Sequence, residues 1–471
     1  MEQKKQTFGV IIGTRNIFNA SLAVDARSIV LDMLDKMGFN TMILPAGETP
    51  TGNIEGYSDA VKCGEYFRKN GDIIEGIIVI LPNFGDELGI VNALRISGLK
   101  VPVLVVAIDD EDDKVDVNNR RDAFCGKLSV CNNFYQYGIK FTDTFYHTYS
   151  LNSREFTFDL LKFAGICRVV KGMHGLRVGA IGTRPTGFQT MRFSEKLLQL
   201  NEITVIPVDM SEIIAAAEKT DEKDPRVIEK GEAIRNYGTC SAVHQEKIAR
   251  QARFGLAVED WIRENDIDIS AIQCWESIEK NYGCAACVTM SMMGEKLMPS
   301  ACEVDVAGSI SMYALTLAAQ TPSALLDWNN NFAEDRNKVV CTHCSNFPRS
   351  FFQNEIEIGT LDVLGTVLGS EDTFGAVKGK VAAGDMTYFR ISTDDRKGII
   401  KSYLGEGTIT DDPYKMDGGI AVCVIPELQN LMKFLCKNGF EHHVAMVRGH
   451  VSDIMEEAAG NYLGWDLYVH K

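Results

Sequence analysis

The sequence lacks long apolar runs and an excess of positive charge. No apolar run in its 471 residues reaches the roughly 18 residues that a membrane-spanning helix needs. Lys and Arg total 48 against 64 Asp and Glu, so the formal net charge is −16. Proteins that bind nucleic acids or anionic membranes need a basic face, and this charge balance argues against both kinds of partner.

The sequence predicts neither a secretory leader nor a disulfide framework. The polar first residues lead directly into the apolar segment Phe8–Ile12, without the apolar core and cleavage site of a signal peptide. The 13 cysteines are odd in number and scattered through apolar segments, which is typical of reduced thiols. We therefore expect a cytoplasmic protein.

The first third of the chain predicts a parallel sheet. Four short apolar segments have the composition of buried strands, namely Phe8–Ile12, Thr41–Leu44, Gly76–Leu81 and Val101–Val106. Amphipathic segments that suit helices lie between them, so strands and helices alternate. Ligand groups collect at the carboxyl ends of such strands, and Arg15 and Asn83 follow two of these ends.

The remaining sequence predicts two further domains. Apolar strand-like segments and a long charged helical stretch indicate a second α/β domain at 173–335. Short strands that alternate with Gly/Asp turns then indicate a mostly antiparallel region at 336–471. The predicted fold class is α/β, with two doubly wound parallel-sheet domains, the first at 1–172, followed by a β-rich, barrel-like C-terminal domain.

Two C-x-x-C pairs have poor spacing for a zinc site. Cys284 and Cys287 are separated from Cys341 and Cys344 by far more than the 15–20 residues that are usual between such pairs. The packing of small buried thiols is the better interpretation. A zinc site, and with it a zinc hydrolase, is the alternative.

Three polar residues stand in apolar or turn segments that suit a metal site. Glu303 and Asp327 lie in apolar sequence, where an unpaired carboxylate is costly, and His450 follows a predicted strand. Two carboxylates and one imidazole suit an oxygen-rich divalent cation with open positions for a chelating substrate. Glu303 could instead form an ion pair and Asp327 could cap a helix, and Asp305 is a plausible cap for a helix predicted from Val306.

These segments together resemble the L-fucose isomerase and L-arabinose isomerase superfamily. Ala-Cys-Glu303-Val-Asp looks like the family segment with the first metal-binding glutamate, and Asp327 follows at the spacing of the metal-binding aspartate of L-fucose isomerases. Gly449-His450 looks like the turn that carries the ligand histidine. The three-part layout fits the family along the whole chain.

The resemblance implies a metal-dependent aldose–ketose isomerase of a free sugar, such as L-fucose, D-arabinose or L-arabinose, that acts through an enediol. It implies Mn²⁺ held by Glu303, Asp327 and His450, and we expect the two carboxylates to transfer the proton between C1 and C2 as well. It also implies a homo-oligomer, expected to be a hexamer, in which the N-terminal domain contributes to a neighbour's site.

Other features of the sequence leave the ligand set and the substrate open. His343 looks like an additional ligand of the L-arabinose isomerase type, and His443 is a second candidate for metal or substrate binding. The alternatives are an isomerase of a substituted hexose such as sulfoquinovose, and a non-catalytic sugar-binding protein. The candidate substrate-binding residues lie at predicted strand ends and are Arg15, Asn83, Gln273, Trp275 and Glu276.

Overall fold

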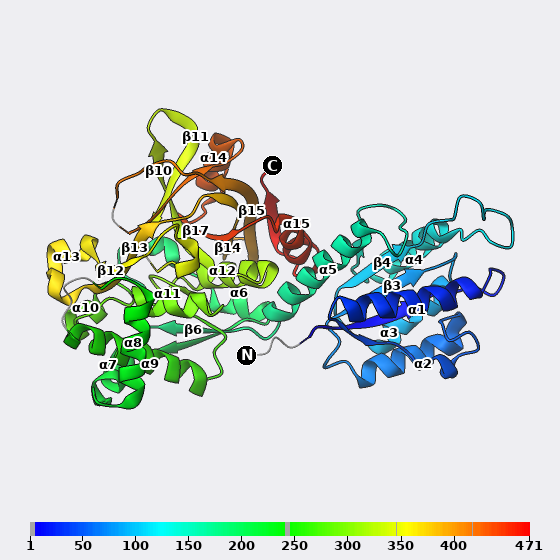
Figure 1. The fold of residues 1–471 in the computed structure, drawn as a ribbon, viewed down its shortest axis with the longest axis horizontal. Coiled ribbons are helices and arrows are strands. Elements are labelled where there is room, and N and C mark those ends of the chain that lie inside the picture. Colours follow the sequence, from blue (N-terminus) through cyan, green and yellow to red (C-terminus); the bar gives the residue numbers. More distant parts are fainter. Residues whose placement is uncertain (1–4, 241–244, 345, 417) are drawn as a thin grey trace. The chain divides into compact units, whose positions relative to one another are not determined.

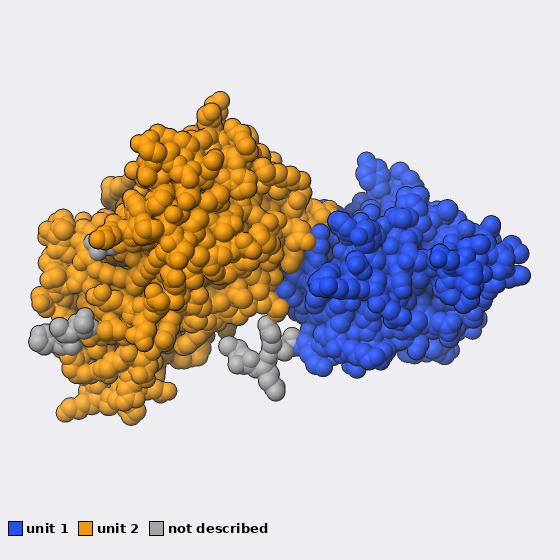
Figure 2. Space-filling view, turned by 45° about the horizontal axis from the view of Figure 1, so that its top comes forward, with its two compact units in different colours: residues 1–171 blue, residues 172–471 orange. Residues whose placement is uncertain are grey.

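The computed structural model describes residues 5–240, 245–344, 346–416 and 418–471. The chain divides into two compact units, residues 1–171 and 172–471 (Figure 2). Both units carry parallel sheets with helices, and the second also carries a large β-rich sheet, which confirms the predicted fold class. None of the helices in the described part is both long and apolar enough to cross a membrane.

The first unit, drawn in blue to cyan in Figure 1, is built on a parallel sheet. This sheet has five strands in the order β2-β1-β3-β4-β5. Its strands are β1 (Thr7–Ile12), β2 (Asn40–Met42), β3 (Gly76–Leu81), β4 (Val103–Ala107) and β5 (Thr142–Asp143). Its helices are α1 (Ser21–Lys36), α2 (Gly56–Lys69), α3 (Glu87–Ser97), α4 (Ala123–Tyr137) and α5 (Arg154–Met173), the last of which runs into the second unit.

The alternation of side chains explains why helices cover both faces of this sheet. In β1, Phe8, Val10 and Ile12 pack in one core with residues of α1 and α5. Ile11 points to the opposite face and packs in a second core with Phe67 of α2. Strands that are buried on both faces are apolar throughout, which is why the sequence displayed them clearly.

The second unit contains a four-stranded parallel sheet in the order β7-β6-β8-β9. Its strands are β6 (Arg177–Ile181), β7 (Thr204–Val208), β8 (Ile269–Ile272) and β9 (Ser300–Ala301). The associated helices are α6 (Glu195–Leu200), α7 (Met210–Lys219), α8 (Pro225–Tyr237), α9 (Gln245–Glu264), α10 (Ser277–Tyr282), α11 (Cys287–Glu295) and α12 (Val306–Ala319).

A nine-stranded, mostly antiparallel sheet forms the rest of the second unit, in the order β12-β13-β16-β11-β10-β17-β14-β15-β18. An additional pairing between β15 and β16 closes six of these strands into a ring, as a barrel requires. The strands are β10 (Ser323–Phe332), β11 (Asp335–His343), β12 (Glu357–Thr360), β13 (Phe374–Lys380), β14 (Gly384–Asp394), β15 (Ile399–Ile409), β16 (Gly419–Val424), β17 (His443–Arg448) and β18 (Asp466–Val469). Three short helices accompany them, α13 (Asp362–Leu368), α14 (Leu428–Asn438) and α15 (Ser452–Met455).

Helix α12 joins the two sheets of the second unit. It contacts β6 and β8 of the parallel sheet as well as β14 and β17 of the ring, and nearly all of its residues are buried. Strand β10 follows at once and pairs with β11 and β17, so the β-rich region begins at Ser323, inside the segment 173–335 that the sequence assigned to the central domain. The start of α12 and the strands of the ring therefore lie close together.

Candidate active site and metal centre

The turn between β9 and α12 positions Glu303. Glu303 and Val304 both adopt left-handed backbone conformations, with φ of 54° and 55°. This region disfavours side chains with a Cβ, and most strongly a β-branched residue such as valine. Such strain persists only where the surrounding structure holds it, and it is frequent at functional sites. Asp305, next in the chain, caps α12 by accepting a hydrogen bond from the Gly308 backbone N–H at 2.9 Å.

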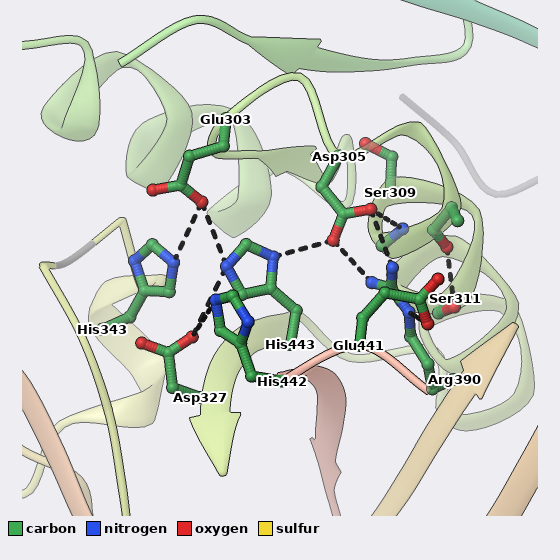
Figure 3. Close-up of polar contacts among 12 residues, drawn as sticks. Glu303, Asp305, Ser309, Ser311, Asp327, His343, Arg390, Glu441, His442 and His443 are labelled. Carbon is green, nitrogen blue, oxygen red and sulfur yellow. Dashed lines mark hydrogen bonds and ion pairs between the residues drawn. The ribbon is translucent and has the colours of Figure 1, made fainter. Parts of the chain in front are cut away.

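Strand pairing in the ring brings Asp327 and His443 together. These two residues stand directly opposite each other on the antiparallel strands β10 and β17. On its other side Asp327 lies opposite Thr342 of β11, and His343 is the last residue of that strand. The register therefore places Asp327, Thr342 and His443 on one face, and Figure 3 shows that the side chain of His343, at the end of β11, also lies beside Glu303.

The four side chains approach one another closely. The Nε2 atom of His443 lies 3.0 Å from Oε2 of Glu303 and 3.4 Å from Oδ1 of Asp327. The Nε2 atom of His343 lies 3.8 Å from the same oxygen of Glu303. Glu303 and both histidines are almost fully buried, whereas the Asp327 side chain is 26% exposed.

Two buried oxygens of this cluster lack the partners that buried polar atoms need. Oε2 of Glu303 and Oδ1 of Asp327 make no hydrogen bond to any described residue, although both face Nε2 of His443. An unsatisfied buried acceptor is costly. A hard octahedral cation such as Mg²⁺ holds ligands at about 2.0–2.1 Å and therefore about 3 Å from one another. The residues present thus fit a divalent cation among these atoms.

The charges of the cluster are balanced by the imidazoles. Burial raises the pKa of Glu303, but contacts with His343 and His443 outweigh burial and hold that pKa well below its usual range. Burial lowers the pKa of His443, yet Asp305 and Glu303 reverse this and raise it to about 9. The proton on His443 supplies the positive charge that a cation would supply, so a cation that takes Nε2 displaces this proton.

A buried set of side chains holds His443 from behind. Its Nδ1 atom lies 2.8 Å from Oδ2 of Asp305, and Arg390 donates to both oxygens of Asp305 at 2.5 and 3.0 Å (Figure 3). Glu441 lies 3.4 Å from Arg390 Nε and accepts a hydrogen bond from Ser392 at 2.7 Å. A carboxylate behind a metal-binding imidazole fixes which ring nitrogen faces the metal. The sequence predicted Asp305 only as a helix cap.

A cavity of about 550 Å³ opens beside the cluster. Phe188 and Trp275, in edge-to-face contact at 5.6 Å, form an aromatic part of its wall. Among the described lining residues, the only Lys or Arg side chain is that of Lys378, which is paired with Asp362. The cavity is of a size that holds a small ligand. Its polar wall also includes Glu303, Asp327, His343, His442 and His443.

Comparison with known proteins adds a family to this geometry. Residues 9–174 match the family model described as the fucose/sulfoquinovose isomerase N-terminal domain, and residues 341–471 match the L-fucose isomerase C-terminal domain. The chain belongs to the L-fucose isomerase superfamily. The resemblance stated from the sequence is thereby confirmed, and the family matches together with the relatives below identify the chain as an aldose–ketose isomerase.

Several relatives of this isomerase are named sulfoquinovose isomerase. The sulfoquinovose isomerase of Priestia aryabhattai is 24% identical over 446 residues, which cover 94% of each chain. The sulfoquinovose isomerase of Alkalicoccus urumqiensis is 26% identical over 290 residues, or 61% of this chain and 63% of that one. A solved periplasmic solute-binding protein from Actinobacillus succinogenes, with bound D-allose, aligns at 11% identity over 67% of this chain and 93% of that one. The TM-score of this alignment is 0.18, and no argument rests on it.

The structure does not bring His450 to the centre of this isomerase. Its Nδ1 atom lies 2.7 Å from Glu406, its Nε2 atom lies 3.3 Å from Asp385, and its side chain is 52% exposed. It is also absent from the residues that line the cavity. The imidazole that meets both Glu303 and Asp327 is instead that of His443, at the start of the same strand–turn segment.

The predicted substrate-binding residues of the second unit fall in different places. Trp275 lines the cavity. Gln273 joins the loops that follow β6 and β8, because Oε1 accepts from the Thr183 backbone N–H at 3.0 Å and Nε2 donates to the Trp275 carbonyl at 3.1 Å. Glu276 pairs with Lys280 along α10 and does not line the cavity.

The two predicted residues of the first unit are held by contacts between the loops that follow β1 and β3. Asn83 is fully buried, donates to the Thr14 hydroxyl at 3.0 Å and accepts from the Gly85 backbone N–H at 3.0 Å. It ties two strand ends together and presents no free polar group. Arg15 donates to the Gly85 carbonyl at 2.8 Å, pairs with Glu87 and lies 4.4 Å from the centre of the Phe84 ring.

Proposed function

We propose that this aldose–ketose isomerase depends on a divalent metal ion and acts on a free hexose with an anionic group at C6, with sulfoquinovose as the first candidate substrate. The observation that carries the metal dependence is the convergence of Glu303, Asp327 and His443 on one point at the cavity. The substrate is supported by the names of the relatives, two of which align over 94% of this chain.

The proposed ligands are Oε2 of Glu303, Oδ1 of Asp327 and Nε2 of His443, with His343 as a fourth. Hard carboxylate oxygens with imidazole suit Mn²⁺, the ion we expect. When bound, this ion polarises the two sugar oxygens next to the reacting carbons and stabilises the negative charge that develops on them. Asp305 and Arg390 keep His443 in place, so that its Nε2 atom stays directed at the two carboxylates.

The proton transfer falls to the two carboxylates. An aldose–ketose exchange moves a proton between C2 and C1 and needs a positioned acid/base group within hydrogen-bond reach of the substrate. Asp327 is partly exposed and lines the cavity, and Glu303 lies across from it on the buried side. We assign the transfer to this pair, which acts on a sugar bound in the adjacent cavity.

Lys378 supports the anionic end of the substrate. It lies in the cavity wall, where its ammonium group is paired with Asp362. Phe188 and Trp275 offer an apolar wall for the carbon skeleton of the sugar. A sulfonate at C6 would take the place of the Asp362 carboxylate as the partner of Lys378.

A panel of sugars tests this proposal. Purified protein, first stripped with a chelator and then reloaded with Mn²⁺, is assayed with sulfoquinovose, L-fucose, D-arabinose and L-arabinose. We expect isomerisation only after reloading, and fastest with sulfoquinovose. Faster turnover of L-fucose would overturn the substrate, whereas unchanged activity of the stripped protein would overturn the metal. Binding of a sugar without interconversion would instead identify a sugar-binding protein.

The homo-oligomer, with a hexamer as the expected form, stays a prediction that rests on the family resemblance. In that arrangement Arg15 and its loop would contribute to the site of a neighbouring subunit. Light scattering gives the molar mass in solution and decides this point, because a monomer that turned over sulfoquinovose would contradict it.

A further inference from the structure

Three thiols cluster behind the centre described above. The potential ligand atoms of Cys302, His343 and Cys344 all lie within 4.8 Å of one another. The Cys302 thiol also lies beside the thiols of Cys274 and Cys344. The two predicted C-x-x-C pairs do not make this cluster, since Cys341 contacts Cys423 instead. Only Cys344 of those pairs takes part.

The imidazole of His343 stands between two chemically different groups of ligands. Its Nε2 atom lies 3.8 Å from Oε2 of Glu303, on the side of the carboxylates. Its Nδ1 atom lies 3.5 Å from Sγ of Cys344, on the side of the thiols. The first group is made of hard oxygens, whereas the second is made of soft sulfurs, and these prefer different metals.

The spacing on the thiol side suits a tetrahedral ion. With Zn–S bonds of about 2.3 Å and Zn–N bonds of about 2.0–2.1 Å, a tetrahedral site separates sulfur and nitrogen by about 3.6 Å. The observed separation of Cys344 Sγ and His343 Nδ1 is 3.5 Å. Cys274, next to Cys302, completes a set of three thiols and one imidazole, a known set for structural zinc.

An ion can also reach this position. Cys344 is half-buried and lines the same cavity as His343, while Cys302 and Cys274 are fully buried behind them. The cavity therefore offers an entry path to two of the ligands without opening the core. A metal site needs such a path in addition to its ligands.

We propose that Cys302, Cys344 and Nδ1 of His343, with Cys274 as a further ligand, form a second metal site for a thiophilic divalent ion, Zn²⁺ or Cd²⁺. This site shares His343 with the oxygen-rich centre, and that part of the inference rests on the proposed function. A neutral imidazole has a lone pair on only one nitrogen. His343 therefore serves one ion at a time, and a thiophilic ion weakens binding at the oxygen-rich centre.

Cobalt is the probe for the thiol site. Co²⁺ is added to protein that has been presaturated with Mn²⁺, and the thiolate-to-cobalt charge-transfer absorption is recorded. We expect one equivalent of Co²⁺ to develop this band in the wild type, and the band to be lost in Cys302→Ala and Cys344→Ala. The control Cys341→Ala removes a thiol that is as buried as that of Cys302 and stands close before Cys344 in the chain, and it should keep the band.

Two further measurements keep the test decisive. The Cys302→Ala change opens a hole in the core, so a measurement that does not depend on this variant is needed. X-ray absorption of the zinc-loaded wild type counts the sulfur neighbours of the ion. We expect at least two of them at about 2.3 Å. Zn²⁺ should also weaken Mn²⁺ binding by between about 5- and 150-fold, the usual range of coupling between sites, and this coupling should vanish in Cys344→Ala.

The outcomes separate the two proposals. Absence of the charge-transfer band in the wild type, its persistence in both cysteine variants, or a zinc shell without sulfur overturns the thiol site. Equal Mn²⁺ affinity with and without Zn²⁺ overturns the sharing of His343. If the band is present but no sugar is isomerised, the thiol site stands and the proposed function fails.

Discussion

Asp305 lies 2.8 Å from the Nδ1 atom of His443 and fixes the orientation of that imidazole. Because Nδ1 is engaged, Nε2 is the atom that faces Glu303 and Asp327. Asp305 also caps α12, so the same carboxylate anchors the helix between the two sheets and the histidine of the candidate metal centre. The predictions below start from this arrangement.

Replacing Asp305 with Asn should separate its two tasks. Asn remains a good helix cap but cannot hold the His443 proton with a negative charge. We expect Mn²⁺ affinity to fall by about 10- to 100-fold, as is typical when the partner behind a metal-binding histidine is lost. Calorimetric titration measures this affinity. The control Ser392→Ala removes only the outer hydrogen bond to Glu441 and should change the Mn²⁺ affinity far less. An equal loss of affinity in both variants would contradict the role of Asp305 as the partner of His443.

His443 and His450 give opposite predictions. His443→Ala removes a proposed ligand, so Mn²⁺ affinity should fall by more than the 10- to 100-fold effect of an outer partner. His450→Ala removes only contacts with Glu406 and Asp385, and Mn²⁺ affinity should stay within about two-fold, a difference of less than roughly 0.5 kcal/mol. Metal content after gel filtration checks both. A metal-free His450→Ala protein would restore the ligand that the sequence predicted.

Glu303→Gln should remove most of the activity while the fold is kept. The change deletes a proposed ligand and a proposed proton-transfer group, and the latter alone contributes about 10²–10⁴-fold. The measurement is kcat with Mn²⁺ at saturating sugar. Glu357→Gln, at an exposed position on β12, is the matched control and should turn over normally. Near-normal turnover by Glu303→Gln would rule out both roles.

Lys378→Gln should affect sugars unequally. If Lys378 binds the anionic substituent, its loss should raise KM for sulfoquinovose by about 10- to 100-fold, which corresponds to one hydrogen bond to a charged group. KM for L-fucose, which lacks that charge, should change little. Lys380→Gln, two residues along β13 and paired with Asp411 outside the cavity, is the control. Equal effects on the two sugars would place the anion elsewhere.

The stability of the metal-free protein should depend on pH through His443. Its pKa is raised from an ordinary 6.5 to about 9, so its contribution is full below about pH 6.5 and is lost as pH rises through 9. At about 1.4 kcal/mol per pKa unit, this amounts to about 3 kcal/mol. Thermal melts in chelator from pH 6 to 10 measure the decline, which should be absent in His443→Ala.

Mn²⁺ binding should have the opposite trend and tighten up to about pH 9, because it releases the proton of His443.

Local sequence patterns were sufficient to predict four of the five strands of the first unit and to select Glu303 and Asp327 as candidates. The strands of the first unit are buried on both faces, so their apolar runs mark them without further information. Glu303 and Asp327 were noticeable because a carboxylate in an apolar segment requires a partner. Neither inference needed knowledge of which segments lie side by side.

The choice of histidine did need that knowledge. His443 is selected by its pairing with Asp327 across β10 and β17, which are far apart in the sequence. The sequence pattern of either strand alone does not reveal which residues pair across the two strands. The contact of Asp305 with His443 depends on the same long-range packing, and for that reason the sequence indicated only a cap.

The place of β17 inside the closed ring of six strands has a consequence for which histidine serves as the proposed metal ligand. In a strand, a shift of one residue turns every side chain to the other face, so a slip of β17 against β10 would exchange His442 and His443. An open sheet could permit such a slip at its edge. Here β17 is bonded on both sides, to β10 and β14, and the ring returns on itself through β15 and β16. A shift of this strand would have to break both ladders at once, and its place inside the ring leaves it no free edge, so the proposed ligand set stays in a single register.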